Sequence, residues 1–118
     1  MLPQDEELPV NLQRLQAVSR GKVAMQKRLL EIFFQAAEGD IAALKEAIAN
    51  QDFPTIEHKA HQLKGSSANV GIPKMSIAAA ELQKQAHQQT LTEANQLVKE
   101  IENYFQKARQ FAEIHFSD

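Results

Sequence analysis

The sequence contains no cysteine and few residues that interrupt helices. Its 118 residues include 4 glycines and 4 prolines. Without cysteine the chain can form no disulfide, no thiolate nucleophile and no thiolate metal site, which fits a cytoplasmic protein. The glycines are isolated from one another, so the chain has no Gly-rich loop that could hold nucleotide phosphates. A kinase with its own ATP site is therefore disfavoured.

An excess of positive charge and long apolar runs are also missing. The 13 Lys and Arg residues are scattered among 15 Asp and Glu residues, and the net charge is -2. Nucleic-acid binding through a basic face is therefore not expected. The apolar runs are far shorter than the ~20 residues that a membrane span needs, and residues 1–7 are too acidic for a signal peptide. We expect no membrane association and a cytoplasmic location.

Apolar residues at helical spacing are present over most of the chain. The length is that of one domain, and we divide it into a flexible lead, residues 1–8, and a helical domain, residues 9–116. Helices are expected at residues 11–19, 22–37, 41–50, 53–71, 73–88 and 90–116. The pattern has no alternation of strands and helices, which argues against a response regulator. It predicts an all-α fold, an antiparallel four-helix bundle in up-down order with one or more additional short N-terminal helices.

Capping residues set the expected helix boundaries. Residues 38–40, Glu-Gly-Asp, predict a turn, with Asp40 as the N-cap of the next helix. Asp52 can cap the helix that starts near residue 53. Thr90 and Glu93 have the spacing of a capping box and are predicted to open the last helix.

The helix expected at residues 22–37 is apolar over too wide a face for one narrow core. Its large apolar residues are Val23, Leu29, Leu30, Ile32, Phe33 and Phe34. The surplus can pack under the first helix, or it can form part of a docking surface for a partner.

His61 stands on the outer side of its predicted helix. The core stripe of that helix consists of Phe53, Ile56, Ala60, Leu63, Ser67 and Val70, at alternating spacings of three and four. His61 lies about 130° from the centre of this stripe, so it is expected to be exposed. Lys64, one turn further along, can supply positive charge beside it, and Ala68 follows on the same side.

Gly65 is an unusual residue at this position. Inside a helix a glycine costs about 0.8–1 kcal/mol relative to alanine. The missing side chain beside an exposed histidine leaves room for another molecule to approach. A tight crossing between helices is the alternative, although Gly65 lies opposite the core stripe.

The residues around His61 resemble the signature of the histidine-containing phosphotransfer (HPt) domain family. The matching positions are His61, Leu63, Lys64, Gly65, Ser66, Ser67, Ala68, Asn69 and Gly71. The likeness extends weakly, in the order of helices, over residues 10–111. It implies a four-helix bundle that carries a phosphoryl group on His61 between receiver-domain aspartates in phosphorelay signal transduction. It also implies a monomeric carrier without a cofactor of its own, with Mg²⁺ supplied by the acidic pocket of the receiver partner.

Two residues of the next helix are expected near His61. The short connection through Gly71 makes the helix at residues 73–88 antiparallel to the His61 helix. Gln83 then comes level with His61, and the resemblance implies that a glutamine in this place hydrogen-bonds the imidazole. His87 is expected at the rim of the site.

Imidazole chemistry is consistent with this role. The ring attacks phosphorus through an unprotonated nitrogen, and histidine in water is mostly unprotonated above about pH 6.5. No separate base is needed.

Two other interpretations of these residues are kept. One is a helical protein-interaction module of the same fold that is not phosphorylated. The other, much less favoured, is a metal site formed by Glu57, His58 and His87. We assign no residue of the chain as a metal ligand.

Overall fold

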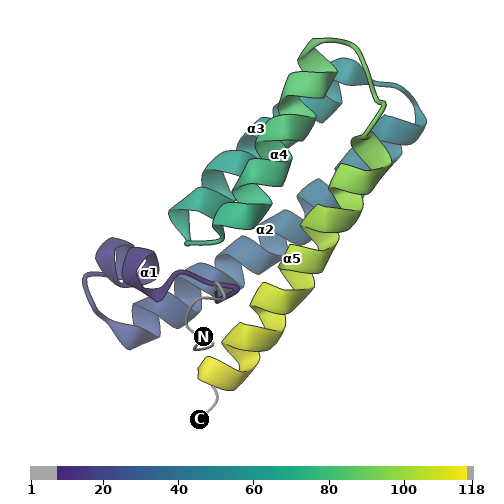
Figure 1. Ribbon diagram of the computed structural model, residues 1–118. Coiled ribbons are helices and arrows are strands. Elements are labelled where there is room, and N and C mark those ends of the chain that lie inside the picture. Colours follow the sequence, from purple (N-terminus) through teal and green to yellow (C-terminus); the bar gives the residue numbers. More distant parts are fainter. Residues whose placement is uncertain (1–7, 117–118) are drawn as a thin grey trace, which may run out of the picture.

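The structure, a computed structural model, describes residues 8–116, and this part of the chain folds into five α-helices without a strand (Figure 1). The helices are α1 (Leu12–Ser19), α2 (Val23–Ala49), α3 (Phe53–Asn69), α4 (Pro73–His87) and α5 (Ala94–His115). The all-α class and the helical bundle predicted from the sequence are confirmed. Of the predicted lead, residues 1–7 lie outside the described residues.

The four longer helices form the bundle, and α1 is the additional short helix. Helix α3 packs on α2 and α4, and α5 packs on α4 and α2, so the four helices close into a ring. Successive helices run in opposite directions, and α1 lies against α2 and α3 near one end of the bundle (Figure 1). No helix in residues 8–116 is long and apolar enough to cross a membrane.

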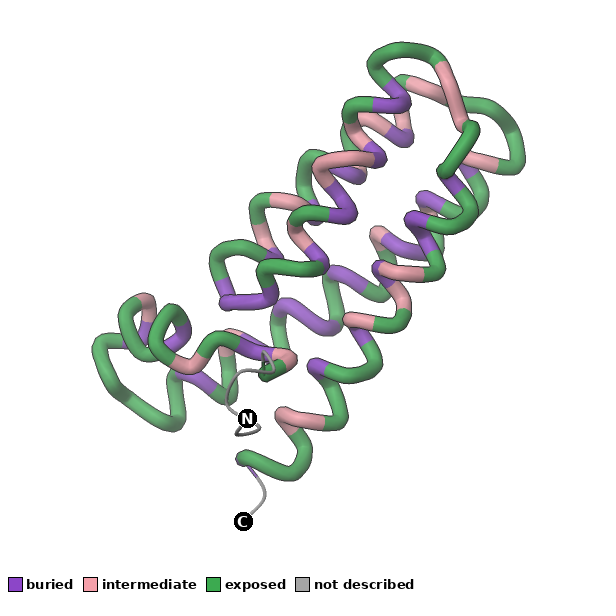
Figure 2. The backbone as a smooth tube through the Cα atoms, viewed as in Figure 1, coloured by how far each residue is buried: buried purple, intermediate pink, exposed green. Residues whose placement is uncertain are grey.

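The buried residues follow the predicted stripes and face the axis of the bundle (Figure 2). In α3 the fully buried side chains are Ile56, Ala60, Leu63 and Ser67, and in α4 they include Met75, Ala79 and Leu82. These stripes fix which faces of α3 and α4 are left to solvent. The buried faces of α3 and α4 therefore determine which polar residues of these two helices reach the surface.

Helix α2 is continuous through residues 38–40, so the predicted turn and the N-cap role of Asp40 are wrong. Its buried stripe continues without a break from Leu30 to Ala47, and this packing outweighs the roughly 1 kcal/mol cost of Gly39 inside the helix. Asp40 instead pairs with Lys59 of α3, at 3.7 Å.

The Asp40 side chain is partly buried. It is 17% exposed. Burial raises the pKa of the Asp40 carboxyl above its ordinary value, and the nearby charge of Lys59 opposes this rise.

The capping box at the start of α5 is also not formed. Helix α5 begins at Ala94, and Glu93 occupies the N-cap position without a side-chain cap. The Glu93 backbone N–H donates to Oε1 of Gln85, at 3.2 Å. The chain needs residues 88–93 to cross from α4 to α5, so it cannot begin the helix at Thr90.

The α3–α4 hairpin begins its helices at the predicted residues, and the two helices end within two residues of the predicted positions. Asp52 caps α3 by accepting a hydrogen bond from the Thr55 backbone N–H, at 3.3 Å, and Pro73 is the first residue of α4. Between the helices Gly71 has a φ of +87°, and a Cβ there would lie 2.7 Å from the carbonyl oxygen of Asn11. Only glycine fits this turn without strain.

The wide apolar face of α2 is partly exposed. Leu30, Phe33 and Phe34 are buried, whereas Val23 and Ile32 are 65% and 49% exposed.

Candidate functional site

Helix α3 holds His61 on its exposed face. The neighbours Ala60 and Leu63 are fully buried, so the register of the helix is fixed by the core. His61 itself is exposed, as the stripe predicts. The imidazole can therefore be reached from solvent without a change in the backbone.

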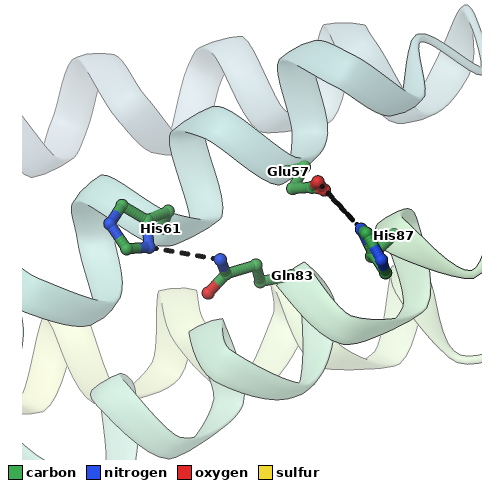
Figure 3. A network of polar contacts seen from close by, with 4 residues as sticks. All are labelled: Glu57, His61, Gln83 and His87. Atoms are coloured by element: carbon green, nitrogen blue, oxygen red, sulfur yellow. Dashed lines mark hydrogen bonds and ion pairs between the residues drawn. The ribbon is translucent and has the colours of Figure 1, made fainter.

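Gln83 of α4 lies beside the His61 ring. Its Nε2 is 3.2 Å from Nδ1 of His61 (Figure 3). Its neighbour Leu82 is fully buried, which directs Gln83 toward the surface next to α3. The other ring nitrogen of His61, Nε2, points away from Gln83 (Figure 3), so the contact occupies one ring nitrogen and leaves the other accessible.

The Gln83 carboxamide can serve either tautomer of His61. With its NH₂ group toward the ring, Nδ1 accepts the hydrogen bond and the neutral ring carries its proton on Nε2. A half-turn of the carboxamide brings its oxygen to Nδ1 instead, so that Nδ1–H donates and the Nε2 lone pair is free. Only the second arrangement leaves an outward-facing nucleophile.

The C-terminal side of His61 is lined by small residues. Gly65 is exposed, and a Cβ built on it has no heavy atom within 4 Å. This excludes the tight helix crossing as the reason for the glycine. Ala68 is exposed two turns along, and Lys64 is half-buried one turn from His61.

Serine hydroxyls hold the backbone next to this open side. The Ser67 hydroxyl donates to the Leu63 carbonyl within α3, at 2.6 Å, as expected for a buried serine. The Ser76 hydroxyl of α4 donates to the Lys64 carbonyl of α3, at 2.9 Å. This second hydrogen bond ties the two helices together one turn from His61. The sequence alone gave no sign of this hydrogen bond.

His87 contacts Glu57 and not His61. Its Nδ1 is 3.3 Å and 3.2 Å from the two carboxylate oxygens of Glu57 (Figure 3). From the sequence, Glu57 was expected only as a possible metal ligand, so this pairing was not predicted. The signal was available, because the helical count that brings Gln83 to His61 also brings His87 to Glu57, one turn away on each helix.

The geometry gives no support to the metal alternative. In the part of the chain that the structure describes, no group of three or more His, Asp or Glu side chains is placed to hold a metal ion. Glu57 and His87 meet as a pair.

Comparison with known proteins agrees with this arrangement. A search of curated proteins found no match. Among solved structures, the fold is similar to that of histidine-containing phosphotransfer protein B from Pseudomonas aeruginosa PAO1, with a TM-score of 0.84 and 24% sequence identity over 90% of this chain and 92% of that one. The sequence profile of the Hpt domain matches residues 28–111, which include α3, α4 and the exposed His61. The chain therefore belongs to the Hpt domain family.

Proposed function

We propose that this chain accepts a phosphoryl group on Nε2 of His61 from a receiver-domain aspartate and passes it to the aspartate of another receiver. Membership of the family gives the general role, histidine phosphotransfer in a phosphorelay; we propose that the chain acts as a carrier that does not use ATP itself. The direction of transfer and the residues that perform it are the proposal. The observation that supports it best is the exposed His61 ring, which Gln83 contacts at Nδ1 while Nε2 faces outward.

The transfer needs no base from this chain. The Nε2 lone pair attacks phosphorus, the P–N bond forms, and the bond from phosphorus to the aspartyl oxygen breaks. The aspartate leaves as a carboxylate, and the ring keeps its proton on Nδ1, where the carboxamide oxygen of Gln83 accepts the hydrogen bond. The ring becomes cationic while the phosphoryl group stays dianionic, so charge is conserved.

Residues around His61 supply access and charge. Gly65 leaves an open path for the donor beside the ring. Lys64, one turn away, offers a positive charge to the moving phosphoryl group. We assign no metal ligand to this chain, and Mg²⁺ is expected to come with the receiver domain.

The partners follow from the same chemistry. They are receiver domains of response regulators or hybrid kinases, which dock over the exposed face of α3 and α4. We propose that the chain works there as a monomer in the cytoplasm.

Phosphotransfer to this chain and to its His61→Gln variant tests the proposal. Phosphorylated receiver domains with Mg²⁺ are the donors, and the product is treated with acid and with alkali. We expect an acid-labile, alkali-stable label on the parent chain and none on a variant that unfolds at the same temperature. A folded parent that several receivers leave unlabelled would favour a docking module without phosphorylation, for which Val23 and Ile32 offer exposed apolar surface.

A further inference from the structure

Two contacts cross from α3 to α4 on the same exposed face. The first joins His61 to Gln83, and the second joins Glu57 to His87 (Figure 3). Glu57 precedes His61 by four residues and His87 follows Gln83 by four, so the contacts are one turn, about 6 Å, apart along the helices. The second contact is therefore an immediate neighbour of the phosphoacceptor.

His87 holds the Glu57 carboxylate toward α4. Both carboxylate oxygens are within hydrogen-bond distance of Nδ1 of His87, and an N–H at this position donates to them in the neutral or the protonated ring. The Glu57 side chain is 34% exposed and the His87 side chain 80% exposed, so His87 is the outer member of the pair. Without it, the Glu57 side chain is free to turn toward His61, its neighbour on the same helix face.

The charges on the two sides of His61 are opposite. Lys64 lies one turn toward the C-terminus of α3 and Glu57 one turn toward its N-terminus. A phosphoryl group on His61 carries about two negative charges, so Lys64 favours it and Glu57 opposes it.

We propose that the Glu57–His87 pair sets how readily His61 accepts and releases the phosphoryl group. The Glu57 carboxylate disfavours a dianion on His61, and His87 is a positioning residue that limits this repulsion by holding the carboxylate against α4. This inference rests on the proposed function, because it concerns the same phosphoacceptor.

Labelling by phosphoramidate tests the inference without a partner protein. In this reaction the Nε2 lone pair of His61 attacks phosphorus, the P–N bond of phosphoramidate breaks, and ammonia leaves. The donor is an anion, so the rate of labelling reports the charge beside the ring. The rate is followed by ³¹P NMR on the full chain at low and high salt, with His61→Gln as the blank.

The inference predicts a definite order for the labelling rates of the variants. Glu57→Gln should be labelled about two- to six-fold faster than the parent at low salt, and the difference should shrink at high salt. His87→Gln should be labelled about two-fold more slowly, because it frees the carboxylate to approach the ring. The double variant, Glu57→Gln with His87→Gln, should match Glu57→Gln alone, since His87 acts only through Glu57.

Glu113→Gln is the matched control, because it removes one exposed carboxylate near the end of α5, a helix that does not pack on α3 in the described part of the chain. Its rate should equal that of the parent, and thermal unfolding should show that all variants are folded.

In the phosphoramidate assay, two results would overturn the inference: equal rates for Glu57→Gln and Glu113→Gln, or an effect of His87→Gln that persists in the double variant. The receiver assay on the same samples separates the two hypotheses. Transfer from receivers without any effect of Glu57 overturns the present inference alone, whereas a lack of transfer from every receiver overturns the proposed function.

Discussion

Helix α3 has two faces that differ in what a substitution can do. The inner face, with Ala60 and Leu63, is completely buried and holds the bundle together. The outer face, with His61 and Gly65, is exposed, and Gly65 leaves open space beside it. The bundle therefore depends on one face of the helix, and the proposed chemistry depends on the other. Substitutions on the two faces should separate stability from phosphotransfer.

The largest effect is expected from Leu63→Ala on the inner face. Leu63 is fully buried, and truncation of such a residue costs about 2–5 kcal/mol through lost burial and the cavity left behind. Urea unfolding should show this loss. His61→Gln, two residues away on the outer face, should change the free energy of unfolding by less than about 0.5 kcal/mol. Similar losses in both variants would mean that the two faces are not separate.

Gly65→Leu should impair phosphotransfer, which depends on the outer face of α3, and leave the packing of the inner face intact. The new side chain fills the open space beside His61, so we expect transfer from a receiver to fall at least ten-fold. The helix should gain up to about 1 kcal/mol of stability, because leucine replaces glycine at an exposed position.

Gly39→Leu is the matched control for this prediction. Gly39 is also an exposed helical glycine with open space around it, but it lies in α2. This variant should show the same gain in stability with unchanged transfer. Unimpaired transfer by Gly65→Leu would show that the donor does not need the open space at Gly65 to reach His61.

Gln83→Ala should have a smaller effect on transfer. It removes the side chain that contacts Nδ1 of His61, and a hydrogen bond of this kind is worth about 0.5–1.5 kcal/mol, or roughly two- to ten-fold in rate. Single-turnover transfer measures the rate, and unfolding should be nearly unchanged. An unaltered rate would show that the ring needs no orientation by α4.

The smallest effect is expected between α2 and α3, from Asp40→Asn. Because burial raises the pKa of Asp40 above 3.8, the folded state binds this proton more tightly than the unfolded state does. The resulting stabilisation is complete below pH 3.8 and is lost as the pH rises through the raised pKa.

Asparagine does not titrate, so Asp40→Asn should gain stability relative to the parent between pH 3 and pH 7. We expect a gain below about 1 kcal/mol, since Lys59 offsets part of the cost of burying the charge. Urea unfolding of both proteins across this range is the measurement. A relative loss of stability toward pH 7 would mean that the ion pair with Lys59 outweighs burial.

Local spacing was enough to predict α3 and its exposed histidine, because a strict core stripe fixes the opposite face. The same reasoning failed at residues 38–40, where turn-forming residues lie inside a helix that packing on α3 and α5 keeps continuous. It failed again at Thr90, because the crossing from α4 to α5 uses the residues that would have formed the cap. Both errors arise where a local preference of about 1 kcal/mol competes with burial of a whole helix face.

By itself the sequence determined the helical class, the register of α3 and α4, the turn at Gly71 and the exposure of His61. Each of these depends on residues within a few turns of one another. The helical count brings His87 level with Glu57, but only the tertiary structure decided that these side chains meet at 3.2 Å and that Ser76 binds the Lys64 carbonyl. These features depend on the distance and rotation between two helices, which the packing of the whole bundle sets and no local pattern encodes.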